Sequence, residues 1–284
     1  MKIGYGSDLH LEIGSSDFKI PEGLDFLLLA GDIFTPWLAA NGRLILQEIG
    51  EEQDKVLAFF KEVSDKVPQT YMVMGNHEHY HGIFTETGDL IRRDYLIDFP
   101  NISLLDNDTV KLGRDSLLFG ATFWTDLKDG NPLVMNDCQR GMNDYHTITD
   151  RRETVLYQYP GSKGPKFLAS SGMRENLYSR KKLTEFLSLV EREEKVPIIM
   201  THHALSLVSL PTRFALDQLS YAYSNTGLDD ILQDTAVTCI HGHIHDEIEI
   251  KLGKSLHLCN PRGYKGYENV AEGFNIKTFE LDII

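Results

Sequence analysis

The sequence predicts a layered α/β sandwich, and three observations favour that fold class. Short, nearly continuous apolar runs recur along the chain, longer amphipathic stretches separate several of them, and a hairpin pattern follows later in the chain. Short continuous apolar runs fit strands that are covered on both faces. Strands that alternate with helices before a hairpin favour a layered sandwich over an all-parallel sheet. In chain order, the predicted strands are residues 3–7, 26–30, 70–74, 116–120, 197–201 and 237–240.

Two helices are predicted from apolar residues at helical spacing. The first spans residues 42–66, where Pro68 stops the pattern, and the second spans residues 173–194. The segment Lys-Leu-Gly-Lys at 251–254 lies between two alternating apolar segments, which predicts a hairpin. Residues 157–172 are rich in Pro, Gly, Ser and Lys, so we expect an exposed loop there, either an inert excursion or a lid over a site.

Length and composition restrict the class of protein. The chain has 284 residues, of which 42% are hydrophobic and 25% charged, and this excludes disordered, collagen-like and small disulfide-rich classes. Such a length suits one large α/β domain or two small ones, and we expect residues 1–284 to form a single domain. The three cysteines form no C-x-x-C pair, so neither a disulfide framework nor a cysteine zinc site is indicated.

Charge and hydropathy bear on location and partners. The formal net charge is −14, which repels long nucleic acid and anionic membranes, so neither is an expected partner. An acidic protein can still handle phosphate esters if bound metal ions supply positive charge. The chain starts without the apolar core of a signal peptide, and its longest apolar runs are too short to cross a bilayer. We therefore expect a cytoplasmic protein.

Carboxylates, amides and histidines follow directly after five of the predicted strands. Carboxyl ends of strands are where open α/β sheets place their ligands, and residues i and i+2 of an extended chain point the same way. Each block alone has an ordinary explanation, such as a helix cap for Asp32 or a turn for any of the histidines. Five such blocks at strand ends supply seven candidate ligands, enough for two metal ions that share a carboxylate. The blocks are Asp8-Leu9-His10, Gly31-Asp32, Gly75-Asn76-His77-Glu78, His202-His203 and His241-Gly242-His243-Ile244-His245.

The order D-x-H, G-D, G-N-H-E, H-H and G-H-x-H resembles the calcineurin-like metallophosphoesterase superfamily, over residues 8–245. The N-P-R-G-Y segment at 260–264 and the segment at 120–126 are similar to a set of uncharacterised bacterial members. The resemblance implies a four-layer αββα sandwich with two divalent metal ions at the strand ends. It also implies a phosphohydrolase that cleaves phosphate esters by attack of a metal-bridging hydroxide.

The resemblance further implies a role for each motif residue. His202 is preferred over His203 because the family's ligand stands first in this block, and His77 would be a catalytic histidine that binds no metal. Mixed nitrogen and oxygen ligands without thiolate suit Mn²⁺, Zn²⁺ or Fe²⁺, with Mn²⁺ expected for activity. One ion would take Asp8, His10, Asp32 and His245, and the other would take Asp32, Asn76, His202 and His243, with Asp32 bridging.

One departure from the family bears on the substrate. Protein Ser/Thr phosphatases continue their G-D block with V-D-R-G, whereas this chain reads Gly-Asp-Ile-Phe-Thr-Pro at 31–36 and lacks that arginine. A phosphoprotein substrate is therefore disfavoured, and we expect a small phosphorylated substrate, either a diester or a nucleotide or other monoester. A non-catalytic metal-binding scaffold of the same fold is the alternative, although all seven ligand positions are present.

Other polar residues are weaker candidates. Arg262 and Tyr264 follow a predicted strand in a Pro-Arg-Gly-Tyr turn, where they either reach a substrate phosphate or form an ordinary surface turn. His79 is expected to be solvated at a helix start. Asn143 and Tyr145 are expected to lie in a turn rather than in a substrate cleft.

Overall fold

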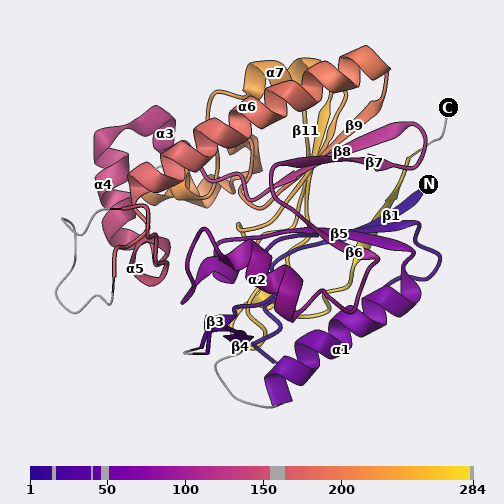
Figure 1. Cartoon of the computed structure of the whole chain (residues 1–284). Helices are drawn as coiled ribbons and strands as arrows, with labels where there is room; N and C mark the ends of the chain where they lie inside the picture. Colours follow the sequence, from indigo (N-terminus) through magenta and orange to yellow (C-terminus); the bar gives the residue numbers. More distant parts are fainter. Residues whose placement is uncertain (15–16, 40, 46–50, 154–163, 216, 282–284) are drawn as a thin grey trace.

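The computed structural model describes residues 1–14, 17–39, 41–45, 51–153, 164–215 and 217–281, and most of its strands form two sheets packed face to face (Figure 1). The strand order is β13-β1-β2-β5-β6 in the first sheet and β11-β12-β10-β9-β8-β7 in the second. The first sheet contains β1 (Lys2–Gly6), β2 (Phe26–Ala30), β5 (Gln69–Val73), β6 (Ile102–Leu105) and β13 (Lys277–Glu280). The second contains β7 (Asp108–Leu112), β8 (Ser116–Ala121), β9 (Val196–Thr201), β10 (Thr238–His241), β11 (Ile248–Leu252) and β12 (Ser255–Cys259).

Strand direction decides where the loops of each sheet gather. In the first sheet β1, β2, β5 and β6 run parallel, and in the second β8, β9, β10 and β12 do so. The antiparallel strands β13, β11 and β7 lie at sheet edges. Because parallel strands end on the same side, the segments that follow β1, β2, β5, β9 and β10 can meet at one edge of the sandwich.

Helices cover both outer faces of the sandwich and make it a four-layer αββα structure. The helices α1 (Glu51–Lys66) and α2 (Thr87–Asp94) pack on the first sheet, and α6 (Ala169–Glu193) and α7 (Asp229–Asp234) pack on the second (Figure 1). A third apolar layer, which includes Ile3, Leu28, Ile198 and Ile240, fills the space between the sheets. Strands covered on both faces explain the continuous apolar runs in the sequence.

A smaller group of helices lies beside the sandwich. We call residues 127–147 the helical flank; they contain α3 (Leu127–Gly130), α4 (Pro132–Gly141) and α5 (Asp144–Thr147). They share an apolar cluster with Trp124 and Phe167. Short 3-10 helices are η1 (His77–His79), η3 (Leu207–Ser209), η4 (Thr212–Phe214), η5 (Gln218–Ala222) and η6 (Asn269–Ala271). Among all helices of the described residues, none has the length and apolar character that crossing a bilayer requires.

The structure confirms most of the predicted elements. Each of the six predicted strands exists, with ends that differ by at most one residue from the prediction. The predicted hairpin is formed by β11 and β12, and Gly253 turns the chain between them with a φ of +56° that suits glycine. The helix predicted over residues 173–194 is α6, which begins four residues earlier.

The predicted helix over residues 42–66 is wrong in its first part. Leu44–Ile45 (β4) pairs instead with Trp37–Leu38 (β3) as a small antiparallel hairpin, and α1 begins only after it. Gly42, at a φ of +76°, closes the turn between these two short strands. Two apolar residues fit the helical spacing by chance, because a pair is too short to distinguish a helix from a strand.

The expected exposed loop over residues 157–172 is also corrected in part. Residues 157–163 lie outside the described residues. Residues 169–172 form the first turn of α6, and Phe167 is fully buried against the ring of Trp124. The stretch is mostly polar in composition, but Phe167 packs into the same apolar cluster as the helical flank.

Candidate metal centre

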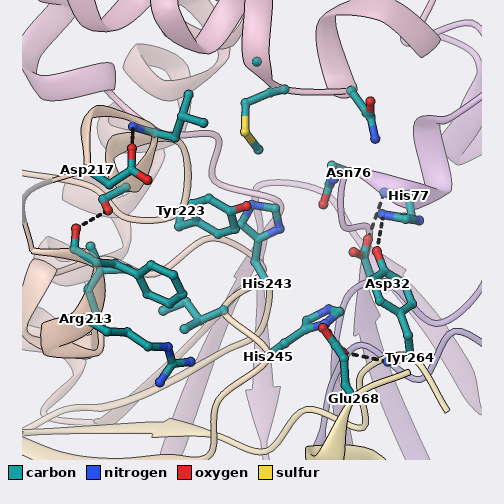
Figure 2. A pocket seen from close by; sticks show the side chains of 18 of the residues that line it. Asp32, Asn76, His77, Arg213, Asp217, Tyr223, His243, His245, Tyr264 and Glu268 are labelled. Atoms are coloured by element: carbon teal, nitrogen blue, oxygen red, sulfur yellow. Dashed lines mark hydrogen bonds and ion pairs between the residues drawn. The ribbon is translucent and has the colours of Figure 1, made fainter. Parts of the chain in front are cut away.

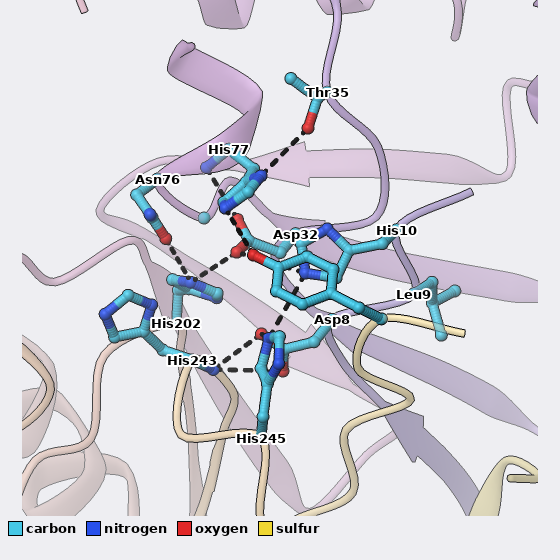
Figure 3. A network of polar contacts seen from close by, with 12 residues as sticks. Asp8, Leu9, His10, Asp32, Thr35, Asn76, His77, His202, His243 and His245 are labelled. Carbon is cyan, nitrogen blue, oxygen red and sulfur yellow. Dashed lines mark hydrogen bonds and ion pairs between the residues drawn. The ribbon is translucent and has the colours of Figure 1, made fainter. Parts of the chain in front are cut away.

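Seven predicted ligand side chains converge at the strand ends of both sheets (Figure 3). Four come from segments that follow strands of the first sheet and three from segments that follow strands of the second. All are buried except His245, which is partly buried. They are Asp8 and His10 after β1, Asp32 after β2, Asn76 after β5, His202 after β9, and His243 and His245 after β10.

The first cluster consists of Asp8, His10 and His245, which follow strands of different sheets. The Nε2 atom of His245 lies 3.3 Å from Oδ1 of Asp8 and 3.4 Å from Nε2 of His10. The Nε2 atom of His10 also lies 3.9 Å from Oδ2 of Asp32. Asp8 accepts the backbone N–H of His243 at 2.9 Å, which fastens the loop after β10 to the loop after β1.

The Nδ1 atoms of His10 and His245 are the far nitrogens of these rings, on the side away from the other ring, and their contacts identify the tautomers. Nδ1 of His10 lies 3.2 Å from Oε1 of Glu12, and Nδ1 of His245 lies 2.7 Å from Oε2 of Glu268. An ionised carboxylate only accepts hydrogen bonds, so we assign the hydrogen of each neutral ring to Nδ1. The lone pairs of both Nε2 atoms then face each other and the carboxylates, an arrangement that fits a cation among them.

The second cluster consists of Asp32, His202 and His243, with Asn76 beside them, and its imidazoles are arranged in a similar way. Nδ1 of His202 donates to the carbonyl of Ala30 at 2.9 Å. Its Nε2 lies 3.0 Å from Oδ1 of Asn76 and 3.4 Å from Oδ2 of Asp32. Nε2 of His243 is buried and has no hydrogen-bond partner in the described residues. Two imidazole lone pairs and two oxygen acceptors around one point fit a divalent ion with nitrogen and oxygen ligands.

Charge in the centre favours a cation as well. Burial opposes ionisation of Asp32, yet the neighbouring histidines hold the pKa of its carboxyl well below the usual range. Burial likewise opposes protonation of His202 and His245, but adjacent carboxylates raise their pKa values to about 9 and about 10. Protons on these imidazoles supply the positive charge that a bound cation would otherwise supply.

Backbone strain is concentrated at the same positions. Five of the seven residues have positive φ angles between 42° and 69°, a region that residues other than glycine rarely adopt. Each such residue costs about 1–3 kcal/mol, and such strain gathers at functional sites. The strained turns aim the side chains inwards directly after each strand. These residues are Asp8, His10, Asp32, His243 and His245.

His77 lies beside the clusters on η1. Its Nδ1 is 3.1 Å from Oγ1 of Thr35, its Nε2 is 3.1 Å from the hydroxyl of Tyr264, and its backbone N–H donates to Asp32. The single hydroxyl hydrogen of Thr35 is donated to Glu12 at 2.8 Å, so Thr35 accepts from Nδ1–H of His77. Burial lowers the pKa of His77 to about 4. The neutral ring therefore presents an Nε2 lone pair to the hydroxyl of Tyr264.

Several residues of the site were missed by the sequence analysis. Glu12 and Glu268 orient ligand imidazoles, and only the position of Glu12 two residues after His10 could have signalled this. In the sequence, Glu78 is only the last residue of the G-N-H-E block. Its carboxylate accepts the backbone N–H groups of Gly75 at 2.6 Å and Ile33 at 2.7 Å, and so ties together the loops after β2 and β5.

The weaker candidates divide into two groups. Tyr264 lies at the site, in ring contact with His10. Arg262 does not, because only 1% of it is exposed and its guanidinium donates to the backbone carbonyl of Leu9. The reading of Arg262 as part of a surface turn is thus wrong, since the arginine is a buried link between loops. Its role as a phosphate contact stays a prediction, and Arg262 is not among the described residues that line the cavity.

Two histidines near the centre have other surroundings. His79 is buried and stacks on Phe84, so its prediction as a solvated residue is wrong. Nδ1 of His203 donates to the carbonyl of Thr122 at 3.2 Å, and its ring packs against Trp124. It is not part of the metal-compatible groups found among the described residues.

A cavity of about 430 Å³ opens over the two clusters (Figure 2). One side contains four of the predicted ligands together with His77 and Tyr264, and the opposite side is partly apolar. The four ligands are Asp32, Asn76, His243 and His245. Asn143 lies in this wall at the start of α5, whereas Tyr145 is buried in the helical flank. The apolar wall contains Met142, Leu210, Phe214, Leu219 and Tyr223.

The comparisons with known proteins agree with this architecture. The sequence matches the calcineurin-like phosphoesterase family over residues 10–247, and the chain belongs to that family. Its members are phosphoester hydrolases that typically bind two divalent metal ions. No curated protein matches the chain in sequence.

A solved structure shows the same fold at low sequence identity. The phosphopantetheinyl hydrolase PptH from Mycobacterium tuberculosis is 12% identical, with a TM-score of 0.58 over 93% of this chain and 89% of that one. A Staphylococcus aureus protein, assigned provisionally as a 5'-nucleotidase and solved with α-ketoglutarate, is 16% identical with a TM-score of 0.49. This match covers 94% of the present chain and 49% of the nucleotidase chain.

Proposed function

We propose that this protein is a phosphohydrolase that uses two divalent metal ions to cleave a small phosphate ester. The observation that supports it most strongly is the convergence of imidazole lone pairs and carboxylate oxygens at two adjacent points, with the far nitrogens of His10, His245 and His202 bonded elsewhere. When bound, the ions supply an activated water and offset the charge of the phosphate. One ion would be held by Asp8, His10, Asp32 and His245, and the other by Asp32, Asn76, His202 and His243.

His77 and Tyr264 are the proposed catalytic residues. His77 presents Nε2 to the cavity, where it can hold or pass on a proton near the leaving oxygen. Burial raises the pKa of Tyr264, so its phenol stays protonated. Its one hydrogen is donated to Nε2 of His77 in this structure and could turn to a phosphate oxygen of a bound substrate. Tyr264 thereby supplies a donor in a site that lacks the arginine of the protein phosphatases.

The shape and charge of the cavity support a small substrate. A volume of about 430 Å³ is in the usual range for a site that takes one small molecule. Arg213 is the only lysine or arginine among the described residues that line it, and it is paired with Asp246. We therefore propose a phosphomonoester or diester of nucleotide size with an uncharged, partly apolar leaving group against the far wall.

Hydrolysis of a chromogenic phosphate monoester and of its diester counterpart tests this function. Metal-stripped protein should be inactive, and Mn²⁺, Zn²⁺ or Fe²⁺ should restore turnover. Asp32→Ala should lose activity together with bound metal, whereas His77→Ala should keep its metal and lose about 10²–10⁴-fold in turnover. Full metal occupancy in Asp32→Ala would contradict the shared carboxylate. Two bound ions without turnover on any ester would favour the metal-binding scaffold.

A further inference from the structure

A buried hydrogen-bonded triangle lies directly behind the second cluster. The side-chain amide of Asn76 donates one hydrogen to Oδ1 of Asp144 at 2.8 Å and the other to the hydroxyl of Tyr80 at 3.0 Å. Tyr80 in turn donates its own hydrogen to Oδ1 of Asp144 at 2.6 Å. The exposed fractions of Asn76, Tyr80 and Asp144 are 3%, 8% and 2%.

The number of hydrogens on Asn76 and Tyr80 determines which group donates and which accepts in each of the three hydrogen bonds. The phenol has one hydrogen and the carboxylate oxygen accepts it, so the phenol oxygen can only accept from Asn76. Both amide hydrogens of Asn76 are then used on Asp144 and Tyr80. Its carbonyl Oδ1 must point the other way, towards Nε2 of His202 at 3.0 Å.

We propose that Asp144 is a positioning residue that fixes the side-chain amide of Asn76 for metal binding. The inference rests on the proposed function, in which Asn76 is a ligand of the second ion. A rotated amide would turn its NH₂ group towards the ion, and an amide nitrogen has no lone pair to offer. Asp144 thus makes one of two amide orientations dominant.

Asp144 also lies next to the wall of the cavity in the sequence. Asp144 is the first residue of α5 in the helical flank, and its neighbour Asn143 lines the substrate cavity. The triangle is therefore a direct polar link, among the described residues, between the wall of the cavity and a proposed ligand.

Metal titration by calorimetry on the metal-stripped protein tests the proposal. The wild type should bind two Mn²⁺ ions. Asp144→Ala should bind the second ion about 10–100-fold more weakly, the usual effect of removing a partner that orients a ligand, while binding of the first ion is unchanged. Asp144→Asn, whose carbonyl can still accept both hydrogens, should retain affinity within a few-fold. Equal affinity of Asp144→Ala and wild type for both ions would overturn the proposal.

A matched control separates positioning from general damage to this region. Asp150 is also fully buried, and its carboxylate bonds to Arg152 and not to a proposed ligand. Asp150→Ala should lower thermal stability without weakening the second ion. An equal loss of the second ion in Asp150→Ala would assign the effect to packing and refute the role of Asp144. Tyr80→Phe, which keeps the ring, should give an intermediate loss.

A second measurement is independent of metal and of activity. With nitrogen-15 asparagine in the metal-free protein, the two side-chain amide hydrogens of Asn76 should exchange slowly with solvent in the wild type and in Asp144→Asn. They should exchange at least tenfold faster in Asp144→Ala. Wild-type protein that binds no metal but shows this protection would reject the proposed function and leave the orientation intact. Rapid exchange in the wild type would reject the orientation itself.

Discussion

At the scale of single residues, the position of each ring hydrogen decides what the histidines of the centre can do. Glu12, Glu268 and the carbonyl of Ala30 each take the hydrogen from the outer nitrogen of one ring. The inner nitrogens are left as bases that can bind a cation. Apart from Glu12, which stands two residues after His10, these partners were not predictable, because a carboxylate such as Glu268 approaches the centre from a distant turn that no local pattern connects to His245.

Thr35 offers a test of the same principle at His77. Thr35→Val keeps the shape of the side chain but removes the oxygen that accepts from Nδ1–H of His77. The ring is then free to change tautomer or rotate, so we expect kcat to fall about tenfold or more while metal content stays at the wild-type level. Steady-state kinetics with metal analysis measures both quantities.

The conservative variant provides the control for that experiment. Thr35→Ser keeps the hydroxyl and should recover most of the activity. If Thr35→Val loses metal in proportion to activity, the effect runs through Glu12 and His10 rather than through His77.

At the scale of elements, most strands were predictable and most loop geometry was not. Strands such as β2 and β9 are covered on both faces, so their apolar runs mark them directly. The hairpin of β3 and β4 is too short for periodicity to identify. The blocks at the strand ends predicted which residues gather, but the left-handed turn at Asp32 depends on contacts with Glu78 that form only in the folded chain.

Gly75 follows β5 at a position where the loop after β2 leaves no room for a side chain, and mutation can test this. A Cβ atom at this position would lie 2.0 Å from Oδ1 of Asp32 and 2.7 Å from its backbone nitrogen. We expect Gly75→Ala to displace the shared carboxylate, to lower the thermal midpoint by several degrees and to reduce metal content below one ion per chain. Thermal unfolding and metal analysis measure these effects.

Gly23 is the matched control for that substitution. It lies in an exposed turn, and no atom lies within 4 Å of an added Cβ. Gly23→Ala at its φ of +69° should cost stability through backbone strain alone and should keep both ions. Equal metal content in the two variants would contradict the steric argument at Gly75.

At the scale of the whole molecule, the centre joins the two sheets, and its charge links stability to pH. In the metal-free protein the pKa values of His202 and His245 are raised to about 9 and about 10, above an unfolded value near 6.5. The folded state therefore holds protons that the unfolded state has released. The resulting stability is fully present below about pH 6.5 and is lost as the pH rises through 9 to 10.

We accordingly expect the thermal midpoint of the metal-free protein to fall between pH 7 and pH 10. Excess Mn²⁺ should raise the midpoint and flatten this decrease, since a bound cation replaces the protons on the ligands. Thermal scans in chelator and in Mn²⁺ across this pH range measure both effects. A metal-free midpoint that rises with pH over the same interval would contradict the assignment of charge in the centre.

Because the ligands of the centre come from both sheets, they are synthesised at different times. Asp8, His10, Asp32 and Asn76 leave the ribosome early, but His202, His243 and His245 follow more than a hundred residues later. A nascent chain therefore carries the oxygen-rich half of the centre well before the imidazoles that complete it. Stable uptake of the two proposed ions would have to wait until the second sheet has formed, so a full complement of metal would mark a chain in which both sheets have folded.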